Sequence, residues 1–184
     1  FFLDTLDSYQ LAAKTPEERA AQEAGLVRTV KTLKAAFPQA KLIFNRGFEV
    51  LPQLAQEADM VAAESLYRGW DQKNRRYQPV PEADRAWLLG QLEQVRTRHQ
   101  RPVLAIDYVA PQERTLARET AKRIQSHGFI PWVTTPDLDT LGVGAVEVLP
   151  RRLLILHDAE VGKDSTEMNS SDALRFFATP AYYL

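Results

Sequence analysis

Acidic side chains end three short apolar runs of the chain. The acids are Asp4, Glu64 and Asp107, and each follows three or four consecutive apolar residues. A run that is apolar at every position is typical of a strand buried on both faces, as in a parallel sheet. Parallel strands end at one edge of the sheet, where α/β folds build their sites, so we expect these carboxylates to converge. Converging carboxyl groups serve glycoside hydrolysis and also metal binding.

Two of these acids differ in their sequence surroundings. Glu64 follows small apolar residues, which favour its protonated form and the role of general acid/base. Asp4 lies beside Thr5 and near Ser8, whose hydroxyl groups could keep it ionised as a nucleophile. A separation of about 5–5.5 Å between the carboxyl groups would retain the anomeric configuration, and about 6.5–9.5 Å would invert it. We expect retention, with Asp107 as the alternative to Asp4.

Polar and aromatic residues near the expected strand ends are candidates for binding a substrate. Asn45 and Arg46 suit substrate hydroxyl groups, although Asn-Arg-Gly is equally an ordinary turn, and Asp7 could equally cap a loop. Aromatic rings past strand ends could stack on the apolar faces of sugars. The residues that we expect to bind substrate are Asp7, Asn45, Arg46, Tyr67, Trp70, Asp107, Tyr108 and Trp132.

The composition excludes several classes of site. The chain has no cysteine, which excludes thiol catalysis, thiolate metal sites and disulfides. It contains no HExxH motif, glycine-rich phosphate loop or nucleophile elbow, and the sequence predicts neither a metal nor a cofactor. Two rival functions stay open at this point. One is a metal-dependent hydrolase using Asp4, Glu64 and Asp107, and the other is a catalytically silent carbohydrate-binding or scaffold module.

The charge pattern bears on the partners. The 184 residues carry a net charge of −1, and acidic and basic residues are interspersed. No basic stripe indicates nucleic-acid binding. No apolar stretch has the length needed to span a bilayer, so we expect no membrane insertion.

Helical patterns alternate with the apolar runs along the chain. Because right-handed crossovers make such strands parallel, the pattern predicts an α/β fold. A long polar and aromatic loop is expected at 67–80. The expected strands are 1–4, 41–44, 60–64, 103–107, 129–134 and 152–157. The expected helices begin near residues 15, 52, 81, 111 and 173.

The two ends of the chain differ in character. Phe1 opens directly in an expected core strand, so we expect earlier strands to precede it. Residues 1–150 are predicted to form one domain. Residues 151–184 are expected to hold a last strand and helix, or to begin a following α/β domain.

Five segments carry a resemblance to a known family: 2–9, 42–49, 61–67, 104–108 and 131–135. They resemble the hydrolase domains of the PelA family, the bifunctional hydrolases and deacetylases of the Pel biofilm polysaccharide, and more distantly the endo-α-1,4-polygalactosaminidases. The resemblance implies a (β/α)8 TIM-type barrel, of which this chain would be the C-terminal part from about strand 4 onward.

The same resemblance implies an endo-acting glycoside hydrolase. Its substrate would be a cationic, partly deacetylated polymer of α-1,4-linked N-acetylgalactosamine. The protein would work in the periplasm or outside the cell and associate with other polysaccharide export proteins. The segment of metal-binding His and Asp residues that deacetylation needs is not visible, so that activity is not carried over.

Overall fold

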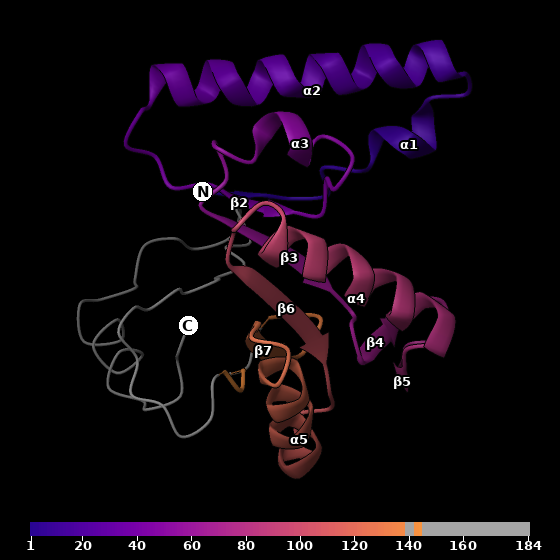
Figure 1. Cartoon of the computed structure of the whole chain (residues 1–184). Coiled ribbons are helices and arrows are strands. Elements are labelled where there is room, and N and C mark those ends of the chain that lie inside the picture. Colours follow the sequence, from indigo (N-terminus) through magenta and orange to yellow (C-terminus); the bar gives the residue numbers. More distant parts are fainter. Residues whose placement is uncertain (139–141, 145–184) are drawn as a thin grey trace, which may run out of the picture. The chain divides into compact units, whose positions relative to one another are not determined.

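The computed structural model describes residues 1–138 and 142–144, and strands alternate with helices through most of this part (Figure 1). The strands are β1 (Phe2–Leu3), β2 (Ile43–Asn45), β3 (Met60–Glu64), β4 (Arg68–Asp71), β5 (Arg76–Pro79), β6 (Val103–Tyr108) and β7 (Ile130–Thr134). The helices are α1 (Tyr9–Ala12), α2 (Pro16–Ala36), α3 (Leu51–Leu54), α4 (Glu82–Thr97) and α5 (Arg114–Gln125).

Five of the strands form one sheet in the order β1-β2-β3-β6-β7. Hydrogen bonds join β1 to β2 and β2 to β3 in parallel, as the apolar runs predict. The α/β fold class is thus confirmed, and each expected strand within the described residues is found to within two residues of its expected bounds. The chain divides into two compact units. Unit 1 holds residues 1–66 and 80–105, and unit 2 holds residues 67–79 and those from 106 onward.

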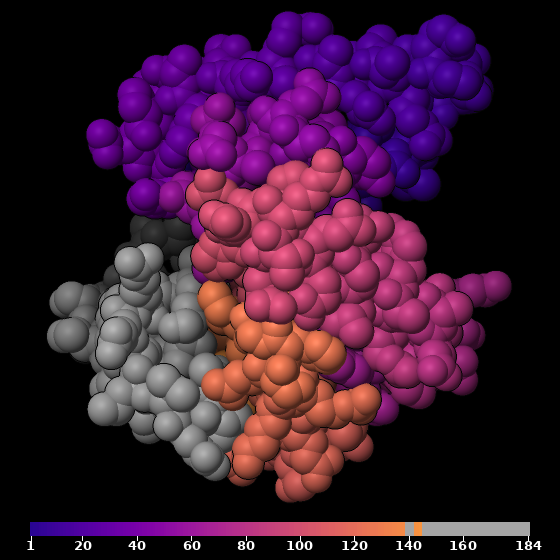
Figure 2. All heavy atoms as spheres, in the orientation of Figure 1, coloured from indigo at the N-terminus to yellow at the C-terminus, as the bar shows by residue number. Residues whose placement is uncertain are grey.

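In unit 1, α2 begins where its capping residues require. The Thr15 hydroxyl accepts a hydrogen bond from the Glu18 amide (3.2 Å), and the Glu18 carboxylate accepts one from the Thr15 amide (3.3 Å). This reciprocal capping box satisfies amides that the first turn leaves unpaired. Only Val27 and Val30 of α2 are buried. The helix therefore lies on the surface of this unit (indigo in Figure 2).

The core of unit 1 consists of aliphatic side chains from its strands and from α3 and α4. Phe44 of β2 and Val61 of β3 are fully buried. Helix α4 buries Leu88, Leu92 and Val95, the face that its spacing predicts. This packing fixes the first three strands of the sheet, whose ends carry the candidate site.

Residues 67–80 differ from the expected irregular loop. In unit 2 they form an antiparallel hairpin, with β4 paired to β5 and Trp70 opposite Tyr77. The Asp71 carboxylate closes the turn by accepting hydrogen bonds from the Asn74 amide (3.0 Å) and the Asn74 side chain (2.7 Å). An aspartate that bonds the backbone a few residues on is a common turn device. The polar composition of the segment concealed this hairpin.

The rest of unit 2 packs α5 against β7. The buried face of α5 is made by Ala117, Thr120, Ala121 and Ile124. Val133 of β7 exchanges two backbone hydrogen bonds with Val143. The expected strand at 152–157, the expected helix near 173 and the domain boundary near 150 lie outside the described residues. Among the helices that are described, none has the length and apolar character to cross a membrane.

Candidate active site

Three neighbouring strand ends of unit 1 bring Asp4, Asn45 and Glu64 together. Leu3 pairs with Phe44 in the parallel register of β1 and β2, so the next residues, Asp4 and Asn45, lie opposite each other. Asn45 in turn is level with Ala62, two residues before Glu64. Because side chains alternate along a strand, Ala62 and Glu64 lie on the same face as Asn45. The sequence prediction that Asp4, Asn45 and Glu64 share one edge is therefore supported by the register.

The Asn45 side-chain amide bridges the two carboxylates. Its Nδ2 donates a hydrogen bond of 2.7 Å to Asp4 Oδ1 and one of 2.8 Å to Glu64 Oε1. The two distances together limit the separation of the bonded carboxylate oxygens to about 5.5 Å at most. This upper limit is compatible with the spacing of about 5–5.5 Å in retaining glycosidases and lies below the spacing of about 6.5–9.5 Å in inverting ones.

Burial differs among these three side chains. Asn45 is only 3% exposed, Glu64 is half-buried and Asp4 is exposed. The Asn45 Oδ1 atom is buried and has no hydrogen-bond partner within the described residues. A fixed donor beneath two more accessible carboxylates sets their spacing while leaving them open to a ligand.

The backbone is in the left-handed region immediately after each of these residues. Thr5 has φ 50°, Arg46 has φ 62° and Ser65 has φ 62°. Non-glycine residues adopt such values rarely, and a β-branched threonine does so least readily. Strained backbone of this kind clusters at functional sites, where the surrounding structure enforces it. Three of the six such residues in the described part of the chain follow these three strands, which supports a functional role for this edge.

Backbone contacts tie the three strand ends to each other. The Leu6 amide donates to the Asn45 carbonyl (3.1 Å), and the Arg46 amide donates to the Ala62 carbonyl (2.8 Å). Gly47, at φ 72°, passes so close to Leu6 that an added Cβ would lie 2.9 Å from the Leu6 Cβ. The spacing of the polar side chains is therefore set by rigid backbone.

Asp7 and Arg46 were both expected to bind substrate, and the structure pairs them with each other. Arg46 Nη1 lies 3.7 Å from Asp7 Oδ2, and both side chains are about one-third exposed. The same Asn-Arg-Gly segment thus makes a turn and places the Asn45 side chain in the site. The turn interpretation is thus found in the structure, and binding of substrate hydroxyl groups by Asn45 and Arg46 stays a prediction.

Asp107 of unit 2 has a different set of contacts from Asp4 and Glu64. It is fully buried, and its Oδ2 accepts hydrogen bonds of 2.8 Å from the backbone amides of Tyr67 and Arg68. These bonds anchor the start of the β4–β5 hairpin. Direct binding of substrate by Asp107 stays a prediction, and this buried carboxylate acts on the hairpin backbone.

The aromatic candidates of unit 2 are mostly enclosed. Tyr67 is 8% exposed, its hydroxyl lies 2.6 Å from His127 Nε2, and the Arg123 guanidinium lies 4.2 Å from its ring centre. Trp132 is also 8% exposed, and its indole packs closely against Gly142. Little of either ring is accessible to a sugar, so their substrate contacts stay predictions.

Trp70 and Tyr108 are more accessible. Trp70 is half-buried, contacts Tyr77 edge to face at 4.8 Å between ring centres, and donates from Nε1 to Gln72 Oε1 (2.7 Å). Tyr108 is half-buried at the end of β6. Both stay candidates for contact with substrate.

The structure also bears on the alternative hypothesis of a metal-dependent hydrolase. Among residues 1–138 and 142–144, no group of three His, Asp or Glu side chains could hold a metal ion. The rival metal-dependent hydrolase using Asp4, Glu64 and Asp107 therefore has no ligand cluster in this part of the chain.

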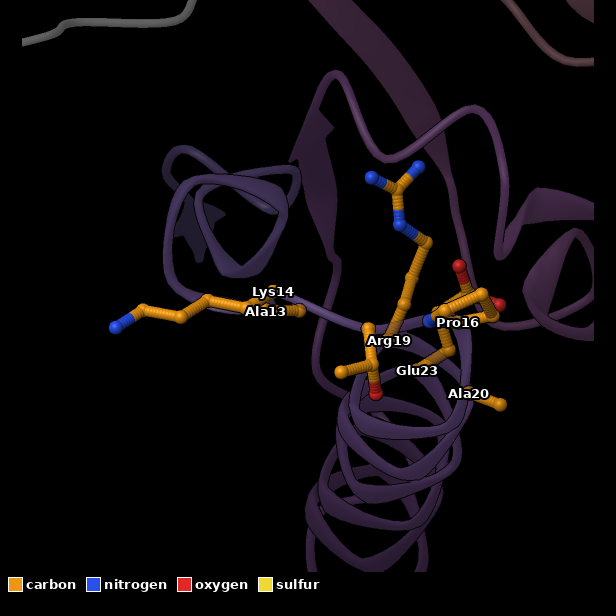
Figure 3. A pocket seen from close by; sticks show the side chains of 7 residues that line it. Ala13, Lys14, Pro16, Arg19, Ala20 and Glu23 are labelled. Atoms are coloured by element: carbon orange, nitrogen blue, oxygen red, sulfur yellow. The ribbon is translucent and has the colours of Figure 1, made fainter.

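A surface hollow of about 340 Å³ lies elsewhere in unit 1, at the start of α2 (Figure 3). Lys14 and Arg19 reach away from each other at its rim. Glu23, which also lines it, accepts a hydrogen bond from the Tyr9 hydroxyl (3.0 Å). None of the three residues at the strand ends lines this hollow, and its mixed charges indicate no chemistry.

Comparison with known proteins agrees with this geometry. The model of glycoside-hydrolase family GH114 matches residues 1–150. The chain belongs to this family. No curated protein matched the chain.

Two solved structures give similar results. The glycoside hydrolase domain of PelA from Pseudomonas aeruginosa is 47% identical over 77% of this chain, with a TM-score of 0.72. A variant of that domain with one glutamate replaced by alanine is 46% identical, with a TM-score of 0.71. The GH114 chain described here spans about 55% of the length of each. The resemblance to PelA-type hydrolase domains, and with it the TIM-type α/β fold class, is therefore confirmed.

The sequence did not reveal the bridge made by Asn45 in this GH114 site. The sequence cannot show that an asparagine at a strand end donates hydrogen bonds to two acids, because these bonds depend on the register of three strands. The positive φ values at Thr5 and Ser65 likewise have no local signal. At Arg46 the sequence predicts only an ordinary Asn-Arg-Gly turn, not a left-handed backbone at the arginine.

Proposed function

We propose that this protein cleaves an α-1,4-linked N-acetylgalactosamine and galactosamine polymer, the Pel exopolysaccharide, by endo-acting hydrolysis with retention of configuration. The observation that carries the proposal is the pair of carboxylates, Asp4 and Glu64, held within about 5.5 Å by Asn45. Membership of a glycoside-hydrolase family supports the reaction class. The similarity to the PelA hydrolase domain supports the choice of polymer.

In the first step, Asp4 is the nucleophile. Its exposed carboxylate attacks the anomeric carbon while protonated Glu64 gives its proton to the glycosidic oxygen. The glycosidic carbon–oxygen bond breaks, and a glycosyl ester with Asp4 forms. Glu64 is half-buried at the end of β3, next to the buried Ala62 and Ala63, and is accessible to a glycosidic oxygen above the strand ends.

In the second step, the roles reverse. Ionised Glu64 takes a proton from water, and the water oxygen attacks the same anomeric carbon. The ester bond to Asp4 breaks, and both carboxyl groups return to their starting states. Two displacements at one carbon restore the original anomeric configuration. Asn45 acts as a positioning residue that keeps the two groups at this spacing.

The setting of the reaction is part of the proposal. A polymer that contains free galactosamine is cationic, and an exposed carboxylate such as Asp4 favours its approach. We place the protein in the periplasm or outside the cell, together with other polysaccharide export proteins. Asp7, Arg46, Trp70 and Tyr108 are the further residues assigned to substrate, and their exposure allows that contact.

Digestion of purified Pel polymer tests the proposal. Wild type should release oligomers, whereas Asp4→Asn and Glu64→Gln should lower kcat by orders of magnitude with little change in polymer binding. Glu57→Gln is the matched control, because Glu57 is a half-buried glutamate that precedes β3 at its other end. Near wild-type turnover by Asp4→Asn would remove Asp4 from the mechanism. Polymer binding without cleavage by wild type would instead indicate a silent binding module.

A further inference from the structure

Unit 1 exposes an aromatic pair whose function the carboxylate site does not explain. Trp87 of α4 is 51% exposed, among the most exposed large hydrophobic side chains of the described residues. Its ring meets Phe48 edge to face, with 6.1 Å between centres and 78° between planes. Such a contact holds an indole in one orientation while leaving a face open to solvent.

The pair lies close to the candidate active site. Phe48 follows Asn45 by three residues, through the strained turn of Arg46 and Gly47. Three residues of chain span about 10 Å at most, so Phe48 stays near the bridging amide. Because Trp87 contacts Phe48, the ring pair is connected to the bridging amide by a short stretch of chain.

Acidic side chains accompany the rings. Glu49 follows Phe48 directly and is exposed. Asp84 is exposed in the first turn of α4 and lies three residues before Trp87, which places both on one helix face. Arg85, between them in sequence, lies 3.9 Å from Glu82. An aromatic face beside carboxylates suits a ligand that has apolar surface and positive charge.

We propose that Phe48 and Trp87 form a sugar subsite, and that its occupant is a positively charged galactosamine unit of the same polymer, outside the units being cleaved. This deepens the proposed function and rests on it. The ammonium group lies over the Trp87 indole or beside Asp84, and the ring carbons contact the indole face. Neighbouring sugars then extend from this subsite to Asp4 and Glu64.

Binding of α-1,4-galactosamine oligomers of graded length tests the subsite. We expect Trp87→Ala to weaken binding of long oligomers about twofold to thirtyfold, the range of a cation–π contact from an exposed to a desolvated site. Binding of the shortest cleavable oligomer should not change. Trp87→Phe should recover most of the affinity, and Asp84→Asn should weaken binding of deacetylated oligomers more than of acetylated ones.

Phe37→Ala is the matched control. Phe37 is a 59% exposed aromatic residue directly after α2, on the segment that leads to the start of β2 rather than to its end. Equal binding by Trp87→Ala and wild type, or an equal loss in Phe37→Ala, would overturn the subsite. A change of oligomeric state in Trp87→Ala without loss of oligomer affinity would overturn it too, by making the pair an interface between copies.

The same experiment separates the two proposals. Binding that depends on Trp87, without any cleavage by wild type, would refute the hydrolase function and leave the subsite standing. Cleavage that depends on Glu64 but not on Trp87, at every oligomer length, would refute the subsite alone.

Discussion

Replacing Asn45 by aspartate tests whether its amide is needed to hold two carboxylates together. The variant exchanges a shared donor for a third carboxylate, with neighbours at 2.7 and 2.8 Å. At an effective dielectric constant of about 20, repulsion at such distances is about 6 kcal/mol per pair. Protonating one ordinary carboxyl group at pH 7 costs only about 4 kcal/mol, since each pH unit is worth about 1.36 kcal/mol. The variant should therefore take up a proton when it folds.

Proton uptake limits the loss of stability and gives it a pH dependence. We expect Asn45→Asp to lower the free energy of unfolding by about 3–4 kcal/mol at pH 7. Because the folded variant binds more protons than the unfolded chain, its stability falls as pH rises and recovers as pH falls toward about 4. Urea unfolding of variant and wild type at pH 7, 5.5 and 4 measures both effects.

Asn74→Asp is the matched control for this change. Asn74 Nδ2 also donates to a carboxylate, Asp71 Oδ2, at 2.7 Å, but Asn74 is exposed and Arg76 lies beside the same oxygen. Solvent screening should keep its cost within about 1 kcal/mol at every pH. If Asn45→Asp proved no more costly than Asn74→Asp at pH 7, the bridging role of Asn45 would be refuted.

Three further predictions concern the scaffold of unit 1. Burial opposes ionisation of Asp59, but the ammonium of Lys41 and other donors outweigh it and lower its pKa. Asp59→Asn should therefore cost about 1 kcal/mol at pH 7, and urea unfolding should show this difference shrink as pH falls below about 4 and through the lowered folded-state pKa. A cost that does not change with pH would contradict this. Burial raises the pKa of Tyr9 to about 12, so the wild-type protein should lose stability as pH rises from about 10 to 12. Thermal unfolding of Tyr9→Phe over the same pH range should show a smaller loss, and an equal loss would show that Tyr9 is not the titrating group. Gly47→Ala would place a Cβ 2.9 Å from the Leu6 Cβ, on a residue with positive φ. It should lower the free energy of unfolding in urea by about 1–3 kcal/mol. An unchanged unfolding midpoint would show that the turn accommodates the methyl group.

Local patterns in the sequence predicted the scaffold well. The Thr15–Glu18 capping box and the buried face of α4 follow from short-range rules, and both are found as expected. Apolar runs located the strands because a strand buried on both faces is apolar along most of its length. The acids at their ends were recognisable for the same reason, and two of them, Asp4 and Glu64, meet at one amide.

Features that depend on pairing between distant segments escaped prediction. The β4–β5 hairpin has polar strands, so no alternation of apolar and polar residues indicated it. The hydrogen bonds of Asp71 stabilise its turn. The buried state of Asp107 follows from two backbone amides about forty residues away. The three strand-end acids look alike in the sequence, but Asp4 and Glu64 bind a side-chain amide whereas Asp107 binds backbone amides.

The anomeric configuration of the first product tests the central claim most directly. Proton NMR during digestion of an α-1,4-galactosamine oligomer by the wild-type protein records which anomer appears before mutarotation mixes the two. Since Asn45 holds the bonded oxygens of Asp4 and Glu64 within about 5.5 Å, the α anomer should appear first. Initial release of the β anomer would show inversion by more widely separated groups and would contradict it.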